Sequence, residues 1–191
     1  TQFPEQRWSP GMSWNNIPTG SGTGIAALVV DDNEIAATVA PGALGAPPTV
    51  ALPAYYRVDN RARTVAGTGE TLAYDRAPND RVLVVTGTIG AGQPPMIWKL
   101  GVDDPGDYAA WRLAEMLRAR GVTVTGAVRA RHRPLMPEDD PELRRGAPAV
   151  RAPQPAPLAT LTPPPLGEDI VTINKLSQNL HAELLLRRLG M

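Results

Sequence analysis

Residues 169–190 read DIVTINKLSQNLHAELLLRRLG, and this stretch says most about the fold of the chain. Apolar residues recur at helical spacing on both sides of the polar triplet Ser177-Gln178-Asn179. Leu180, Leu184 and Leu185 continue the spacing after the triplet, and Gly190 stands where a glycine often ends a helix. The pattern predicts two helices that meet at the triplet, where Ser177 and Asn179 can both point into one cleft.

The composition excludes several classes of function. The 191 residues carry a formal net charge of +0, so no overall field favours nucleic acid. Cysteine is absent, which rules out disulfides, thiolate metal sites and cysteine nucleophiles within the chain. No apolar run reaches the length of a membrane span, and Thr1-Gln2-Phe3-Pro4 does not resemble the start of a signal peptide. We expect no cofactor, no bound metal and no nucleic-acid partner, and the oligomeric state stays open.

Short β-like runs dominate the first half of the chain. They are separated by Gly, Pro, Asn and Asp, as in small antiparallel sheets. Residues 25–30 and 34–40 flank Asp31-Asp32-Asn33, which predicts a hairpin with an Asp-Asn turn. The strongest strand pattern is at 81–89. Together these runs predict a small antiparallel β domain at residues 21–95.

One helix follows the β-like runs. Asp104 can cap it, Pro105 suits its first position, and Gly121 lies just past its end. Residues 122–129 then have the pattern of a strand, and the proline-rich stretch 134–165 that of a long exposed connection. Two sets of side chains are expected in the core, namely the helix face (Trp111, Leu113, Ala114, Leu117) and the indoles (Trp8, Trp14, Trp98, Trp111).

The Ser-x-Asn triplet has a simpler explanation, because a serine before a helix is an ordinary N-cap. A second copy, Ser13-Trp14-Asn15, lies in an irregular loop and is assigned no chemistry. His181 and Glu183 lie two positions apart, so they occupy different helix faces and do not form a ready metal or acid/base pair. We interpret these two residues and His132 as surface residues.

Residues 173–187 closely resemble the class C, low-molecular-mass penicillin-binding proteins, which are D-alanyl-D-alanine carboxypeptidase/endopeptidases. The resemblance implies an α+β fold in which a small β-rich domain is nested in an α/β insertion, followed by a helical return into a serine-transpeptidase, β-lactamase-like domain. The implied divisions are 1–20 with 96–160 for the outer insertion, 21–95 for the nested domain, and 161–191 for the catalytic domain.

The resemblance also implies roles for two residues. Ser177 corresponds to the hydroxyl that relays a proton near the nucleophile and the leaving amine, and Asn179 to the amide that binds the catalytic lysine and the substrate. The implied partners are peptidoglycan peptides and β-lactams, and the implied location is extracytoplasmic, in the periplasm or cell envelope.

Two further motifs of that family do not occur in the chain. None of its serines begins Ser-x-x-Lys, and neither Lys99 nor Lys175 begins Lys-Thr-Gly. We therefore expect the chain to be part of an enzyme and inactive alone. The alternative is a non-catalytic β-rich module that binds the cell wall or has a structural role.

Overall fold

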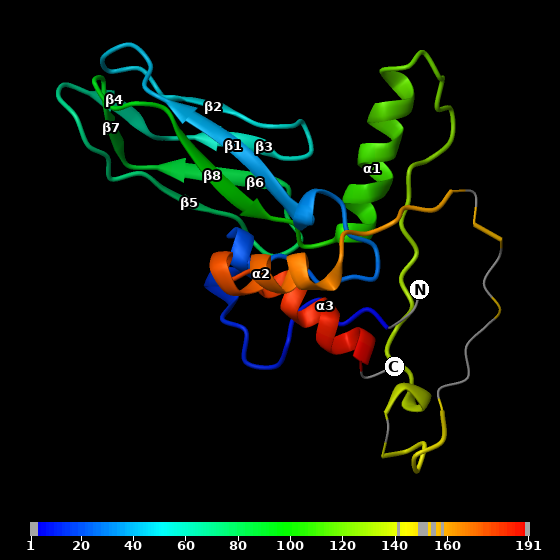
Figure 1. Ribbon diagram of the computed structural model, residues 1–191. Coiled ribbons are helices and arrows are strands. Elements are labelled where there is room, and N and C mark those ends of the chain that lie inside the picture. Colours follow the sequence, from blue (N-terminus) through cyan, green and yellow to red (C-terminus); the bar gives the residue numbers. More distant parts are fainter. Residues whose placement is uncertain (1–3, 141, 149–152, 154–155, 158, 190–191) are drawn as a thin grey trace.

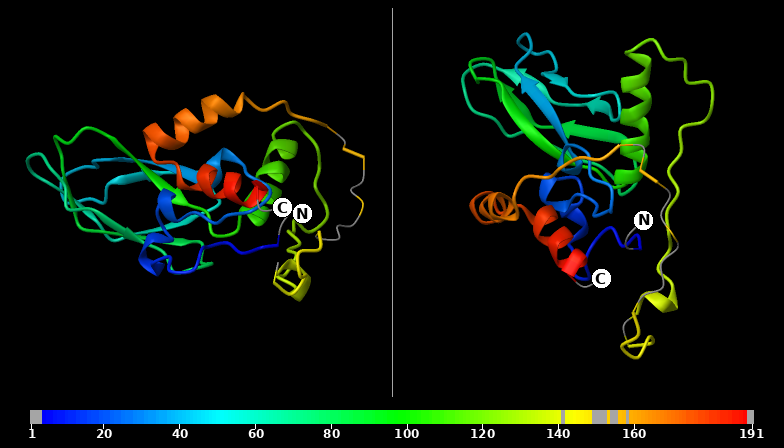
Figure 2. Two further views of the ribbon diagram at one scale, coloured as in Figure 1. Left: turned by 60° about the horizontal axis from the view of Figure 1, so that its bottom comes forward. Right: turned by 45° about the vertical axis from the view of Figure 1, so that its right-hand side comes forward.

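The computed structural model describes residues 4–140, 142–148, 153, 156–157 and 159–189. Its fold is α+β, as predicted, with short strands and three α-helices. Figure 1 shows the strands gathered at one end, helix α1 beside them, and helices α2 and α3 below them. The residues that follow α1, as far as 140, run down the other side of the molecule (Figure 2, right).

Strand β1 (Glu34–Ala40) forms the centre of the first sheet. It pairs antiparallel with β2 (Thr49–Ala51) on one side and β8 (Met96–Gly101) on the other. Ile35, Ala37 and Val39 alternate into the core and are all buried, as expected for a strand with one covered face. Ile35 lies opposite Leu100 of β8, which is also buried.

The second group of strands mixes parallel and antiparallel pairs. Strand β6 (Val82–Thr86) lies between β3 (Arg57–Asn60), to which it is parallel, and β5 (Ala73–Asp75), to which it is antiparallel. Strands β4 (Arg63–Val65) and β7 (Thr88–Gly90) form a separate parallel pair. The sequence did not indicate parallel pairing.

The expected strand at 81–89 is divided in two by Gly87. Its φ of +93° suits glycine, and a Cβ there would lie 2.2 Å from the carbonyl oxygen of Thr71. Because the chain turns at this point, β6 and β7 belong to different sheets.

The predicted hairpin at residues 25–40 is wrong. Residues 34–40 form β1, but residues 25–30 are not a strand. Both edges of β1 are occupied by β2 and β8, so no edge is left for residues 25–30. Asp31, Asp32 and Asn33 form a 3₁₀ turn (η3), and all three have positive φ, at 52°, 52° and 51°.

Helix α1 (Pro105–Arg118) confirms the predicted signals at its start and end. The Asp104 carboxylate accepts a hydrogen bond from the Asp107 N–H at 2.9 Å, and Gly121 has φ +79°. Ala114 is buried and Trp111 packs against the core, as predicted. Tyr108 and Ala109 are buried as well, whereas Leu113 is 58% exposed, so the buried face is shifted from the predicted one.

Two other expectations are wrong. Residues 122–129 have strand-like sequence but pair with no strand in the described part of the chain, so their backbone forms no ladder. Trp14 is 69% exposed and anchors no core, whereas the half-buried Trp8 donates its indole N–H to the Gly22 carbonyl at 2.8 Å. The connection at 134–165 is largely exposed where it is described, with one short 3₁₀ turn (η4, Pro137–Asp139).

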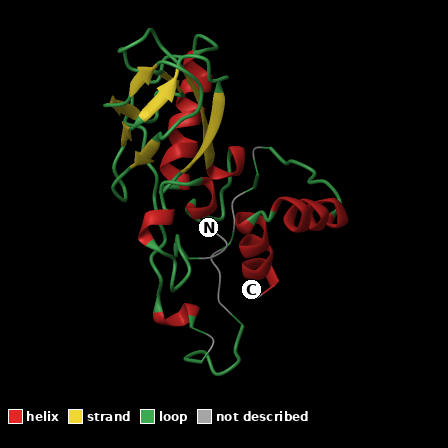
Figure 3. Ribbon diagram, turned by 90° about the vertical axis from the view of Figure 1, so that its left-hand side faces the viewer, coloured by secondary structure: helices red, strands yellow, loops and turns green. Residues whose placement is uncertain are grey.

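The two C-terminal helices form as predicted, α2 at Leu166–Leu176 and α3 at Asn179–Leu189. Figure 3 shows them apart from the strands, next to the N-terminal segment. Leu180 is buried, while Gly190, the predicted end of α3, lies outside the described residues. None of the helices described is long and apolar enough to span a bilayer.

The domain division made from the sequence stays a prediction. The β1–β8 pairing joins residues on both sides of the boundary drawn at 95, so one sheet contains segments of the two implied insertions.

A buried ion pair fixes the junction between the strands and α1. Arg76 pairs with Asp103, and their side chains are 1% and 5% exposed. Asp103 also accepts the Asn79 N–H at 2.5 Å, and Arg76 donates to the Gly101 carbonyl at 3.1 Å. These bonds connect the end of β5, the turn before β6 and the end of β8.

We predict that Asp103→Asn lowers the free energy of unfolding by about 3–5 kcal/mol, because it leaves the Arg76 charge buried without its partner. Urea denaturation measures the change. The matched control is Glu115→Gln, since Glu115 pairs with Arg118 on the surface, and its effect should stay within about 1 kcal/mol. Equal effects of the two variants would contradict the assigned importance of the buried pair.

Candidate functional site

Ser177 lies at the end of α2 in the left-handed conformation, with φ 54° and ψ 46°. The Gln178 N–H bonds back to the Ile173 carbonyl at 3.1 Å, the hydrogen bond that closes a Schellman motif. Most helices place glycine at such a position, because a side chain there is strained. The backbone of Ser177 is therefore strained, and strain of this kind is often found at functional sites.

Gln178, and not Ser177, caps helix α3. Its side-chain oxygen accepts the Leu180 N–H at 3.2 Å, and its carbonyl accepts the Ala182 N–H at 3.3 Å. The interpretation of Ser177 as an ordinary N-cap is wrong, because the left-handed turn moves the start of α3 one residue further.

Ser177 and Asn179 are both exposed on either side of the half-buried Gln178. Within the described part of the chain, neither side chain has a hydrogen-bond partner. Their donors and acceptors are thus available to a ligand. The copy at residues 13–15 differs, since Ser13 donates directly to Asn15 at 2.6 Å.

His181 contacts two other elements and is not the free surface residue expected. Its Nδ1 lies 2.6 Å from Asp169 Oδ1 on α2, and its Nε2 lies 3.1 Å from Asp32 Oδ1 in the η3 turn. Partial burial lowers the pKa of His181, but hydrogen bonds to Asp169 and Asp32 outweigh it and raise the pKa overall. Glu183 forms a separate ion pair with Arg187, at 3.0 Å.

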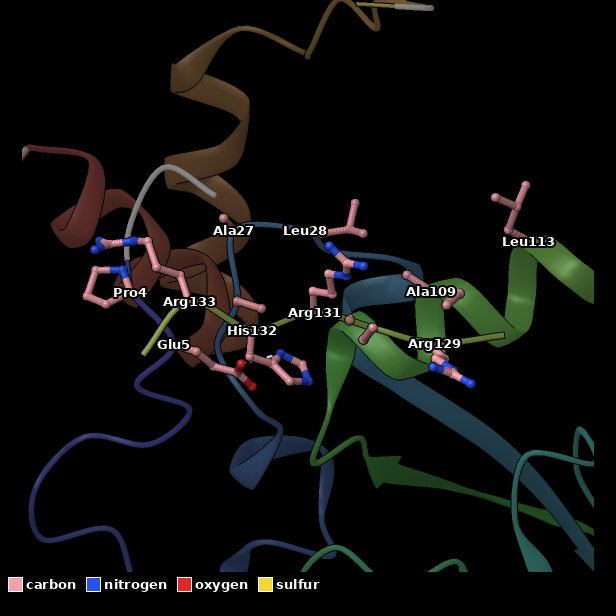
Figure 4. A pocket seen from close by; sticks show the side chains of 14 residues that line it. Pro4, Glu5, Ala27, Leu28, Ala109, Leu113, Arg129, Arg131, His132 and Arg133 are labelled. Atoms are coloured by element: carbon pink, nitrogen blue, oxygen red, sulfur yellow. Dashed lines mark ion pairs between the residues drawn. The ribbon is translucent and has the colours of Figure 1, made fainter. Parts of the chain in front are cut away.

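A cavity of about 320 Å³ lies between α1, the segment 26–28 and the segment 129–133 (Figure 4). One wall is made of small apolar residues that include Ala27 and Ala109. The other contains Arg129, Arg131 and Arg133, which alternate with Ala130 and His132. No sequence pattern predicted this cavity, and the alternating arginines are its only local signal.

Next to the cavity, Glu5, Asp104 and His132 bring ligand-type atoms within 4.8 Å of one another. His132 pairs with Glu5 through Nδ1, and its Nε2 lies 2.9 Å from Asp104. Arg7 pairs with Glu5 and donates to Asp104 at 2.9 Å. Since Arg7 and His132 each contact both carboxylates, the arrangement is explained as an ion-pair network, and we assign it no metal. His132 is thus also more constrained than the surface residue predicted.

Comparison with known proteins decides the family. All residues 1–191 match the D-Ala-D-Ala carboxypeptidase 3 (S13) family. The chain belongs to this family. The resemblance of residues 173–187 to the low-molecular-mass penicillin-binding proteins is thereby confirmed.

A curated relative is the D-alanyl-D-alanine carboxypeptidase of Actinomadura sp. (strain R39), which is 34% identical over 157 residues. The match covers 80% of this chain and 26% of that protein. The chain thus spans about a quarter of the length of this relative.

One solved structure supports the same fold. Penicillin binding protein 4 from Haemophilus influenzae matches with a TM-score of 0.52 and 18% identity, over 70% of this chain and 31% of that one. The same protein complexed with a novel β-lactam matches with a TM-score of 0.43 and 20% identity, over 58% and 26% of the two chains.

In this S13 chain we predict that Ser177→Gly raises the free energy of unfolding by up to about 1 kcal/mol, because glycine adopts the left-handed conformation without strain. Ser177→Val should lower it by about 1–2 kcal/mol, since a β-branched residue fits this conformation poorly. Urea denaturation followed by circular dichroism measures both. The left-handed turn is contradicted if valine is tolerated as well as glycine.

Proposed function

We propose that this chain is a segment of a serine-type D-Ala-D-Ala carboxypeptidase/endopeptidase that acts on peptidoglycan stem peptides through an acyl-enzyme. The observation that carries the proposal is the Ser177-x-Asn179 turn in a chain of the S13 family. The turn presents a hydroxyl and an amide, both exposed, between two helices.

Ser177 is proposed to relay a proton between the nucleophile and the leaving amine. A hydroxyl is suited to this step because it donates and accepts at the same time. Asn179 is proposed to hold the catalytic lysine and the substrate amide, since its side chain offers an acceptor and two donors in one fixed plane.

The nucleophile and its base must come from outside this sequence, which contains neither Ser-x-x-Lys nor Lys-Thr-Gly. We therefore propose that the chain is inactive alone. β-Lactams are proposed as ligands of the complete enzyme, and its proposed location is extracytoplasmic, where peptidoglycan lies.

The domain division is part of the proposal. Residues 161–191 contribute α2 and α3 to the catalytic domain, while 21–95 and the flanking 1–20 and 96–160 form the insertions. A non-catalytic module that binds the cell wall or has a structural role is the alternative, and the cavity beside Arg129 and Arg131 is the feature that favours it.

Acylation by a fluorescent penicillin tests the proposal. The protein to use carries this chain between a Ser-x-x-Lys segment and a Lys-Thr-Gly segment. We predict that Ser177→Ala and Asn179→Ala slow its acylation by about 10²–10⁴-fold, the usual contribution of a positioned proton-transfer group.

Ser13→Ala is the matched control, because it removes a serine from the other Ser-x-Asn triplet and should acylate at the original rate. Unchanged acylation in both Ser177→Ala and Asn179→Ala would refute the assigned roles. Absence of labelling in the unmodified protein would favour the binding module.

A further inference from the structure

The turn Asp31-Asp32-Asn33 stands out because three successive residues without glycine have positive φ. Each such residue is strained, and strain of this kind persists only where the surroundings hold it in place. Asn33 is fully buried and donates its amide to the Gly24 carbonyl at 3.0 Å. Its own carbonyl accepts the Val102 N–H at 3.0 Å. The turn is therefore a fixed part of the β-rich region.

The two aspartates of this turn point to different partners. Asp31 accepts the Tyr108 hydroxyl at 3.1 Å and lies 3.6 Å from Arg112, both on α1. Asp32 lies 3.1 Å from His181 on α3. One strained turn thus contacts α1 on one side and the C-terminal helices on the other.

His181 continues the connection to the functional turn. Its other nitrogen bonds to Asp169 at 2.6 Å, so one imidazole joins α2, α3 and η3. Since His181 follows Asn179 by two residues, within the first turn of α3, its position fixes the start of the helix that presents Asn179.

We propose that His181 is a positioning residue, which holds the Ser177-x-Asn179 turn against the β-rich region through Asp169 and Asp32. The effect of His181 on chemistry rests on the proposed function, whereas its contacts with Asp169 and Asp32 are independent of that proposal. The β-rich region would then act on the catalytic centre by setting the orientation of α3, without touching substrate.

The charge of His181 determines the pH range in which its contacts with Asp169 and Asp32 are stable. The groups that face the His181 ring are Asp169 of α2 and Asp32 of η3, and the charge of Lys99 on β8 also acts on Asp32. The pKa of His181 is raised in the folded chain. The stabilisation is hence complete below the unfolded pKa of histidine and is lost as the pH rises through the folded value.

Amide hydrogen exchange of the 191-residue chain tests the contact without any activity. His181→Gln and Asp32→Asn should each raise exchange at residues 177–183 by about tenfold, as expected for loss of charge-assisted hydrogen bonds. In the unmodified chain the protection should fall as the pH rises through the histidine pKa, after correction for intrinsic exchange. In His181→Gln this step should disappear.

Asp31→Asn is the matched control, because it changes the neighbouring carboxylate of the same turn but leaves the His181 contact intact. It should not alter exchange at 177–183. Equal exchange in Asp32→Asn, Asp31→Asn and the unmodified chain would overturn the proposal.

The effect on chemistry is measured in the complete protein by penicillin acylation. His181→Gln should lower the acylation rate constant more than the affinity of the preceding complex, and its pH profile should lose the step that follows His181. Asp32→Asn should lower the rate in the same way, whereas Asp32→Glu, which keeps a carboxylate at this position, should retain most of it. If the unmodified protein is not acylated, the proposed function fails, while the exchange result still decides the role of His181.

Discussion

The buried pair of Arg76 and Asp103 is the interaction on which the rest of the structure depends. It lies where the second group of strands, the end of β8 and the start of α1 meet, and Tyr56 donates its hydroxyl to the Gly101 carbonyl at 2.7 Å beside it. From this point β8 leads into α1, and Val102, the first residue after β8, bonds to Asn33. The η3 turn is therefore bonded to the residue that precedes Asp103 of the buried pair.

Further contacts connect the η3 turn to the candidate site at Ser177 and Asn179. The η3 turn presents Asp32 to His181, and His181 joins α3 to α2. Between these helices the chain turns at Ser177, whose left-handed backbone sets the direction in which α3 leaves. A polar triplet with weak intrinsic preference for any one shape is thus placed by α2 and α3, which His181 joins to the η3 turn.

Local signals predicted those elements whose determinants are local. The Asp104 cap, Pro105 and Gly121 gave the bounds of α1, and apolar spacing gave α2 and α3. The hairpin at 25–40 was predicted wrongly because both edges of β1 are taken by β2 and β8. Strand β8 lies some sixty residues later, and no local pattern indicates that pairing. Likewise no local feature distinguishes residues 122–129 from a strand. They have the sequence of a strand but pair with no other strand within the described residues.

The candidate site shows the same limit. Ser177 and Asn179 were found from their spacing and the family resemblance. The left-handed backbone of Ser177 and the cap by Gln178 could be identified only in the folded structure. The contact between His181 and Asp32 joins residues 149 positions apart. The i, i+2 spacing of His181 and Glu183 therefore could not predict the partners of His181. The alternating arginines at 129–133 became meaningful only with α1 beside them.

A crystal structure of the complete protein acylated by a penicillin tests the central claim most directly. The account predicts that the Ser177 hydroxyl and the Asn179 amide both lie within hydrogen-bond distance, about 2.5–3.2 Å, of the bound ligand or of the lysine beside the acylated serine. It also predicts a left-handed Ser177. An acylated centre that neither side chain approaches, with both turned to solvent, would contradict the account.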